Sequence, residues 1–209
     1  DWGTIQLGGD DGAADVTHAG GAWIAGGNGL DGAVYTVYAS NYSAGAAFMS
    51  TTSTLQGLDR AQIAYFSPDM NGLSFAVSYV PDGAAQNWSS AGTDGATNIF
   101  AVGASYSGDM GGAGVTLSGG VEHVANLNNA GGLGDDDASH YRVGADVGMG
   151  GLGVNLGYAT TDYATSATVV VDEWTFNAVV SYSMGQHTFG VEGQIAEQKT
   201  AVGGRDTEA

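Results

Sequence analysis

The sequence predicts an all-β fold made of antiparallel strands, and three observations lead to this prediction. Large apolar residues alternate with small or polar ones in segments of about ten residues, and clusters of Gly, Asn, Asp and Ser separate these segments. Glycine supplies 37 of the 209 residues without the regular spacing of collagen. No apolar run approaches the ~18 to 20 residues that a transmembrane helix needs. We therefore expect a single all-β domain over residues 1–209.

The alternation divides each expected strand into a face of large apolar side chains and a face of small or polar ones. In the segment 73–79, Leu73, Phe75 and Val77 share one face, and serine or alanine occupies the positions between them. The same pattern occurs in the segments 3–7, 60–65, 100–106, 115–122, 141–149, 152–158, 174–182 and 188–195. The chain is thus expected to contain about nine strands.

The connections between the expected strands alternate between short and long. The short ones are 68–72, 108–112, 150–151 and 185–186, and the long ones are 81–96, 124–138 and 164–171. The segment 148–153 matches the letters of a dinucleotide-binding fingerprint, but strand alternation resumes at Leu152 where that fingerprint needs a helix. We interpret it as a hairpin turn. Short turns at one end and long loops at the other are typical of membrane β-barrels.

The residue types on the two faces decide between a soluble sheet and a membrane barrel. A soluble sheet normally carries many long charged side chains on its outer face. Here the non-aromatic face consists mainly of Gly, Ala, Ser, Thr, Asn and Gln with isolated charges. Tyrosine and tryptophan tend toward the strand ends, as in interfacial girdles, at Tyr65, Tyr79, Tyr106, Tyr158, Trp174 and Tyr182. We therefore expect a transmembrane antiparallel β-barrel with its apolar face toward lipid and its polar face toward a water-filled lumen.

The charge balance restricts the classes of partner. The chain has 22 acidic and 4 basic residues, for a formal net charge of -18, which argues against nucleic acid and favours enrichment of cations. An arginine on the lipid face near the midplane costs ~2 to 4 kcal/mol, so isolated charges within strands are expected on the lumen face. These expected wall charges are Arg60, Glu122, Arg142, Asp146 and Glu192.

Two pairs of segments carry a resemblance to a known family. They are GTIQLG (3–8) followed by DDGA (10–13), and DRAQIAYFSP (59–68) followed by NGLSFAVSY (71–79). In these segments the chain resembles the general porins of alphaproteobacteria. The resemblance implies a Gram-negative outer-membrane channel for passive diffusion of ions and small hydrophilic solutes. It also implies contact with lipid and lipopolysaccharide, and assembly as a homotrimer.

The resemblance further assigns roles to the long segment 9–58 and to the meander 59–200. In such porins an inward-folded loop narrows the pore and faces basic residues on the wall. The expected constriction acids are therefore Asp10, Asp11, Asp15 and Asp31, opposite Arg60. The complete barrel of this family has an even number of strands, sixteen in the type resembled, so we expect the nine strands here to be a part of it, with both ends truncated.

Other motifs give little sign of catalysis or cofactor binding. The run Asp135, Asp136 and Asp137 follows a single GGLG segment and is a calcium candidate through its carboxylates, with a solvated loop as the alternative. The four histidines lack paired spacing for zinc, and no serine lies in a Gly-x-Ser-x-Gly elbow. We expect no enzyme activity and no cofactor. The rival interpretations are a calcium-stabilised extracellular adhesin or surface-layer β domain, and an outer-membrane enzyme on a smaller barrel.

Overall fold

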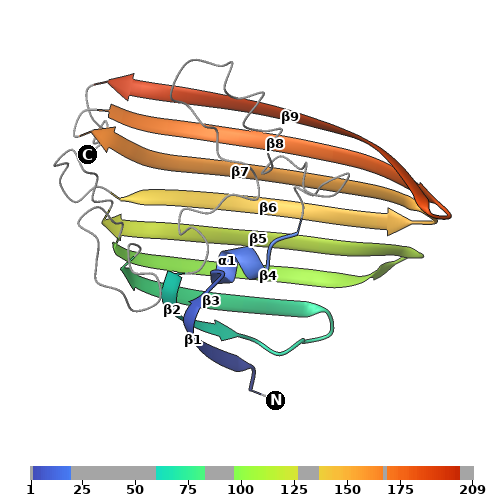
Figure 1. The fold of residues 1–209 in the computed structure, drawn as a ribbon, viewed down its shortest axis with the longest axis horizontal. Helices are drawn as coiled ribbons and strands as arrows, with labels where there is room; N and C mark the ends of the chain where they lie inside the picture. The colour runs from blue at the N-terminus through green and yellow to red at the C-terminus, as the bar shows by residue number, and fades with distance from the viewer. Residues whose placement is uncertain (1, 20–59, 83–96, 127–136, 167–168, 203–209) are drawn as a thin grey trace.

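A computed structural model describes residues 2–19, 60–82, 97–126, 137–166 and 169–202, and these form one antiparallel sheet of nine strands. Each strand pairs with its neighbour in sequence, so the sheet is a simple meander (Figure 1). The strands are β1 (Thr4–Asp10), β2 (Arg60–Phe66), β3 (Leu73–Asp82), β4 (Thr97–Met110), β5 (Ala113–Asn126), β6 (Ala138–Met149), β7 (Leu152–Ser166), β8 (Val169–Met184) and β9 (His187–Val202). The one helix among these residues, α1 (Ala13–Val16), is too short to cross a membrane. The predicted all-β fold is confirmed.

Most of the large apolar side chains of the sheet lie exposed on one face, and the side chains of the other face are mostly small or polar and less exposed. In β3, Leu73, Phe75 and Val77 are 45%, 38% and 40% exposed, whereas Ala76 and Ser78 on the opposite face are 0% and 6% exposed. The same outward exposure recurs at Phe100, Val102, Leu117, Val143, Leu156, Phe176, Val180 and Ile195. The apolar face is therefore not a protein core, as the sequence predicts. We call it the outward face, and the opposite one the inner face.

The tight turns of the meander lie together at one end of the sheet. The turns that follow β2, β4, β6 and β8 are all at the right of Figure 1. The residues Gly150 and Gly151 between β6 and β7 have φ of 58° and 89°, in the left-handed region where glycine has no steric penalty. The segment 148–153 is thus a hairpin, as predicted.

Some boundaries differ from those that the sequence predicts. β3 ends at Asp82 and β4 begins at Thr97, which agrees with the first long connection. The connection expected at 164–171 is much shorter, because β7 continues to Ser166 and β8 begins at Val169. The pairing continues through this region, with a register shift between Ala164 and Ser166, because the β-branched run at the start of β8 still finds partners. The prediction of a long loop there is wrong.

Candidate functional site

The helix α1 lies against the inner face of the sheet, over β3, β4 and β5 (Figure 1). Its residues Ala13 and Ala14 are 0% and 1% exposed and pack with Ala76 and Ala101 from the sheet. A Cβ atom added to Gly120 would come within 3.2 Å of Ala14 Cβ, and one added to Gly103 would overlap Thr17 Oγ1. The small residues Ala76, Ala101, Gly103 and Gly120 therefore leave the space on the inner face into which α1 packs. We call these four residues the helix seat.

Side chains from three strands hold the segment around α1 on this seat. Ser78 Oγ in β3 accepts a 2.9 Å hydrogen bond from the Ala13 backbone N–H. Ser118 Oγ in β5 lies 2.7 Å from both the backbone nitrogen and the backbone oxygen of Ala19. Gln62 Nε2 in β2 donates a 2.8 Å hydrogen bond to the backbone oxygen of Asp11. The polar residues of the inner face thus bind the backbone of the segment 11–19.

The seat gives a first prediction about stability, because two adjacent glycines of β5 point to opposite faces. Gly120→Val should lower the free energy of unfolding by about 1 to 3 kcal/mol, because the added methyl groups overpack the contact with Ala14. Gly119→Val is the matched control, since a Cβ there meets Val143 Cγ1 at 3.8 Å, an ordinary contact. Thermal or urea unfolding measures both variants. An equal loss of stability in the two variants would contradict the close packing of α1 against Gly120.

A buried ion pair connects α1 to the wall of the sheet. Arg142 Nη1 in β6 lies 3.4 Å from Asp15 Oδ1 in α1, and the two side chains are 0% and 25% exposed. A second carboxylate, that of Glu122 in β5, also interacts electrostatically with Arg142. Glu122 is 0% exposed and pairs in register with His140, two residues before Arg142. The arginine therefore forms an ion pair with the acid on the helix and is also attracted by the charge of the acid on the wall.

Neighbouring strands align further polar side chains in one row across the inner face. The strand register places Glu122, His140, Thr161, Glu173 and Gln198 opposite one another on β5 to β9, and we call this set the polar row. His140 Nδ1 lies 2.8 Å from Thr161 Oγ1, and Gln198 Nε2 donates to Glu173 Oε2 at 3.4 Å. Cross-strand pairs of this kind fix side-chain positions.

The row beside it, toward the long connections, is apolar. It contains Val80, Ile99, Val124 and Ala138, each no more than 1% exposed, with Tyr163 packed against them. Sequence alternation alone places these residues on the inner face, although their apolar character does not fit a uniformly polar lumen. Polar and apolar rows therefore share the inner face.

The structure brings some of the predicted site residues together. Asp15, Arg142 and Glu122 form one cluster at α1. Asp146 and Glu192 lie in another row nearer the tight turns, where Asp146 Oδ1 accepts a hydrogen bond from Asn155 Nδ2.

The other predicted residues are only partly described. Asp10 ends β1 and pairs with Arg60 in the backbone register, so it belongs to a strand and not to the expected loop. The side chains of Asp10 and Arg60, and the whole of Asp31, lie outside the part of the chain that the structure describes. Asp11 follows β1 directly, and its backbone oxygen is the acceptor for Gln62. Their constriction roles remain predictions.

Sequence reasoning missed every member of the polar row except Glu122, including three that are almost fully buried. Glu173 is 2% exposed, Thr161 is 2% and His140 is 0%, so all three are inner-face residues. Their alternation with the outward residues Tyr141 and Trp174 would have placed them on that face. The register that joins them across strands is not visible in the sequence.

Calcium binding remains a prediction. Asp135 and Asp136 lie outside the described residues, and Asp137 immediately precedes β6. Among the described residues, no group of three or more His, Cys, Asp or Glu side chains is arranged to hold a metal ion.

Comparison with known proteins gives one match for the whole chain. A family model described as Gram-negative porin matches residues 1–209. A search of curated proteins gives no match. The match agrees with a sheet that exposes its apolar face and buries charged and polar side chains on the other.

Proposed function

The chain belongs to the Gram-negative porins, and from this premise we propose that it forms a general diffusion channel that passes cations more readily than anions. Membership in the family places the chain in the outer membrane, as β-barrel strands that pass small solutes. Diffusion through such a channel needs no conformational cycle. Solutes pass if they fit the narrowest part, and fixed charges change their local concentration.

The observation that carries the proposal is the contrast between the two faces of the sheet. Phe75 and Val77 are exposed on the outward face, whereas the inner face carries the buried charged side chains Glu122, Arg142 and Glu173. Water and ions therefore belong on the inner side, because a charge on the lipid face near the midplane costs ~2 to 4 kcal/mol.

The preference for cations rests on the acids of the inner face. The acids on this face and on α1 whose side chains the structure describes are Asp15, Asp109, Glu122, Asp146, Glu173 and Glu192. Arg142 is the inner-face cation whose side chain is described, and its charge is already matched by Asp15 and Glu122. The remaining carboxylates bias the pore toward cations. Among the proposed constriction acids, Asp15 has the most support, because it sits on a helix held against the wall.

Several finer features belong to the same proposal. We assign the chain to the alphaproteobacterial type on the segments 3–13 and 59–79, and we propose a homotrimer in contact with lipopolysaccharide. We also propose that it has no catalytic activity and no required cofactor. The alternative of a calcium-stabilised adhesin finds no support in the family match. Single-channel conductance in steps of three would support the trimer.

Ion selectivity tests the charge part of the proposal. In a planar bilayer with a salt gradient, the reversal potential should indicate preference for cations. Glu192→Gln and Asp146→Asn should each reduce the permeability ratio, by up to about two-fold at low salt, because each removes one inner-face charge. Glu197→Gln is the matched control, since Glu197 lies on the same strand with its side chain 50% exposed on the outward face.

Different outcomes test the proposed ion selectivity, the proposed channel and the assignment of the two faces separately. Preference for anions in the unmodified protein would contradict the selectivity and leave the channel standing. Absence of conductance from protein that is folded in the bilayer would contradict the channel itself. An equal effect of Glu192→Gln and Glu197→Gln would contradict the assignment of the two faces.

A further inference from the structure

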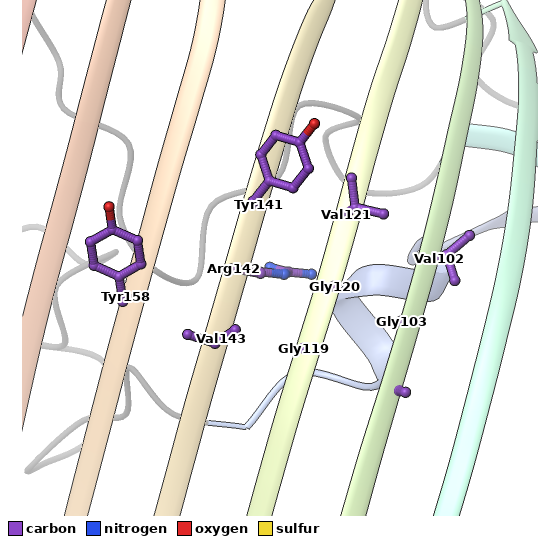
Figure 2. A pocket seen from close by; sticks show the side chains of 10 residues that line it. Val102, Gly103, Gly119, Gly120, Val121, Tyr141, Arg142, Val143 and Tyr158 are labelled. Atoms are coloured by element: carbon purple, nitrogen blue, oxygen red, sulfur yellow. The ribbon is translucent and has the colours of Figure 1, made fainter.

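A hollow of about 560 Å³ opens on the outward face of β4 to β7. Its floor includes the bare backbone of Gly103, Gly119 and Gly120, and the rings of Tyr141 and Tyr158 stand beside it. Figure 2 shows this face with α1 behind the sheet, so the hollow and the helix seat lie on opposite sides of the same strands. The hollow is thus turned toward the membrane and not toward the lumen.

The hollow arises because small residues meet in register on neighbouring strands. Ala104 pairs with Gly119, and Gly119 pairs with Val143. Gly103 and Gly120 are needed on the inner side, where α1 approaches, but a Cβ on Gly119 would meet nothing nearer than 3.8 Å. Contacts within the described part of the chain therefore do not explain why position 119 is a glycine.

A polar border lies directly beside the hollow, on the side of the long connections. His123 on β5 lies two residues after Val121, and Ser139 on β6 lies two residues before Tyr141. The two are paired in register, and His123 Nδ1 lies 3.0 Å from Ser139 Oγ. The same outward row continues with Asp162 on β7. A polar border next to an apolar hollow matches the two parts of an amphiphile, a head group and a hydrocarbon chain.

The charge and size of the hollow narrow the choice of occupant. Arg142 contributes to the lining, but its guanidinium group is paired with Asp15 at the inner face, so the hollow meets no free cation there. A stable protein interface buries about 800 Å² on each partner, which is far more surface than one hollow among ten residues supplies. The hollow is continuous with the apolar surface that a porin exposes to hydrocarbon.

We propose that this hollow is a binding site for one acyl chain of a membrane lipid, from the leaflet at the long-connection end. In barrels of this kind the long loops are external, so this is the outer leaflet. The head group lies beside His123 and Ser139, and the chain fills the space above Gly119. Within a bilayer such binding is driven by close packing, since hydrocarbon gains nothing by leaving hydrocarbon.

Photocrosslinking in defined vesicles tests the site. The protein is reconstituted into phosphatidylcholine vesicles that contain a phosphatidylcholine with a diazirine in the middle of one acyl chain. After irradiation, digestion and mass spectrometry, crosslinks should concentrate on the outward residues of β5 to β7, with Tyr141 and Tyr158 prominent. Gly119→Leu should reduce these crosslinks by roughly three- to ten-fold, because its side chain fills the hollow and removes the packing contacts.

Two further variants keep the test decisive. Ala104→Leu fills the same hollow from the paired strand and should give the same loss if Gly119→Leu fails to fold. Gly193→Leu adds the same side chain to the outward face of β9, where a Cβ meets nothing within 4 Å, and should leave the crosslinks unchanged. Crosslinks spread evenly over the outward face, or unchanged in both filled variants, would overturn the site. Channel conductance should stay at its normal value in all three variants, so the result is independent of the proposed ion selectivity.

Discussion

Replacing Arg142 by methionine is expected to lower the free energy of unfolding by about 3 to 5 kcal/mol, because it leaves two carboxylates on the inner face without their cation. The Arg142 side chain is 0% exposed, and it interacts with Asp15 on α1 and with Glu122 on β5. Loss of the pair should also loosen α1 and increase the noise of the open channel. Urea unfolding in lipid vesicles measures the stability, and single-channel recording measures the noise.

The chain offers a matched control for this result in its exposed ion pair. Lys199 Nζ lies 3.7 Å from Glu197 Oε1, and these side chains are 71% and 50% exposed. Lys199→Met should therefore change stability by no more than about 1 kcal/mol. The double variant Asp15→Asn with Arg142→Met should recover part of the loss, since it removes one of the unmatched charges. If Arg142→Met behaved like Lys199→Met, the buried pair would have no structural role.

The strands and their faces were predictable because both depend on local pattern. Side chains alternate strictly along a strand, so Leu73 and Val77 must share a face whatever the sheet packs against. Residue type identified the exposed face. The outer face of a soluble sheet normally carries many charged side chains, and a face made of serine and alanine does not. The connection at 164–171 was misjudged because its Ala and Thr residues resemble a loop, while pairing with a neighbouring strand extends β7 and β8 through most of it.

The site was predictable only as separate residues. Parity placed Arg142 and Glu122 on the inner face, and the acidic segment after β1 pointed to Asp15. Nothing in the local pattern indicates that α1, of only 4 residues, sits on Gly103 and Gly120. That contact joins positions about a hundred residues apart and depends on tertiary structure, as does the alignment of the polar row.

Placing an arginine on each face of one strand gives the clearest test of which side meets the membrane. Ile195 is 65% exposed on the outward face of β9, and Gln194 is its neighbour on the inner face. Ile195→Arg should destabilise the protein in bilayers by roughly 2 kcal/mol, since an arginine facing lipid costs about 2 to 4 kcal/mol at the midplane and less near the interface.

The same charge at Gln194 should have a different effect, because an inner-face side chain meets the lumen. Gln194→Arg should change the free energy of unfolding by less than about 1 kcal/mol and should shift the reversal potential toward anions, whereas Ile195→Arg should leave selectivity unchanged. Both variants add one arginine to adjacent positions, so differences in expression or net charge do not explain a contrast between them. A larger loss of stability from Gln194→Arg than from Ile195→Arg would reverse the two faces and, with them, the pore. The expected contrast would show that Ile195 faces lipid, where an added charge lowers stability, and that Gln194 faces water, where an added charge changes selectivity.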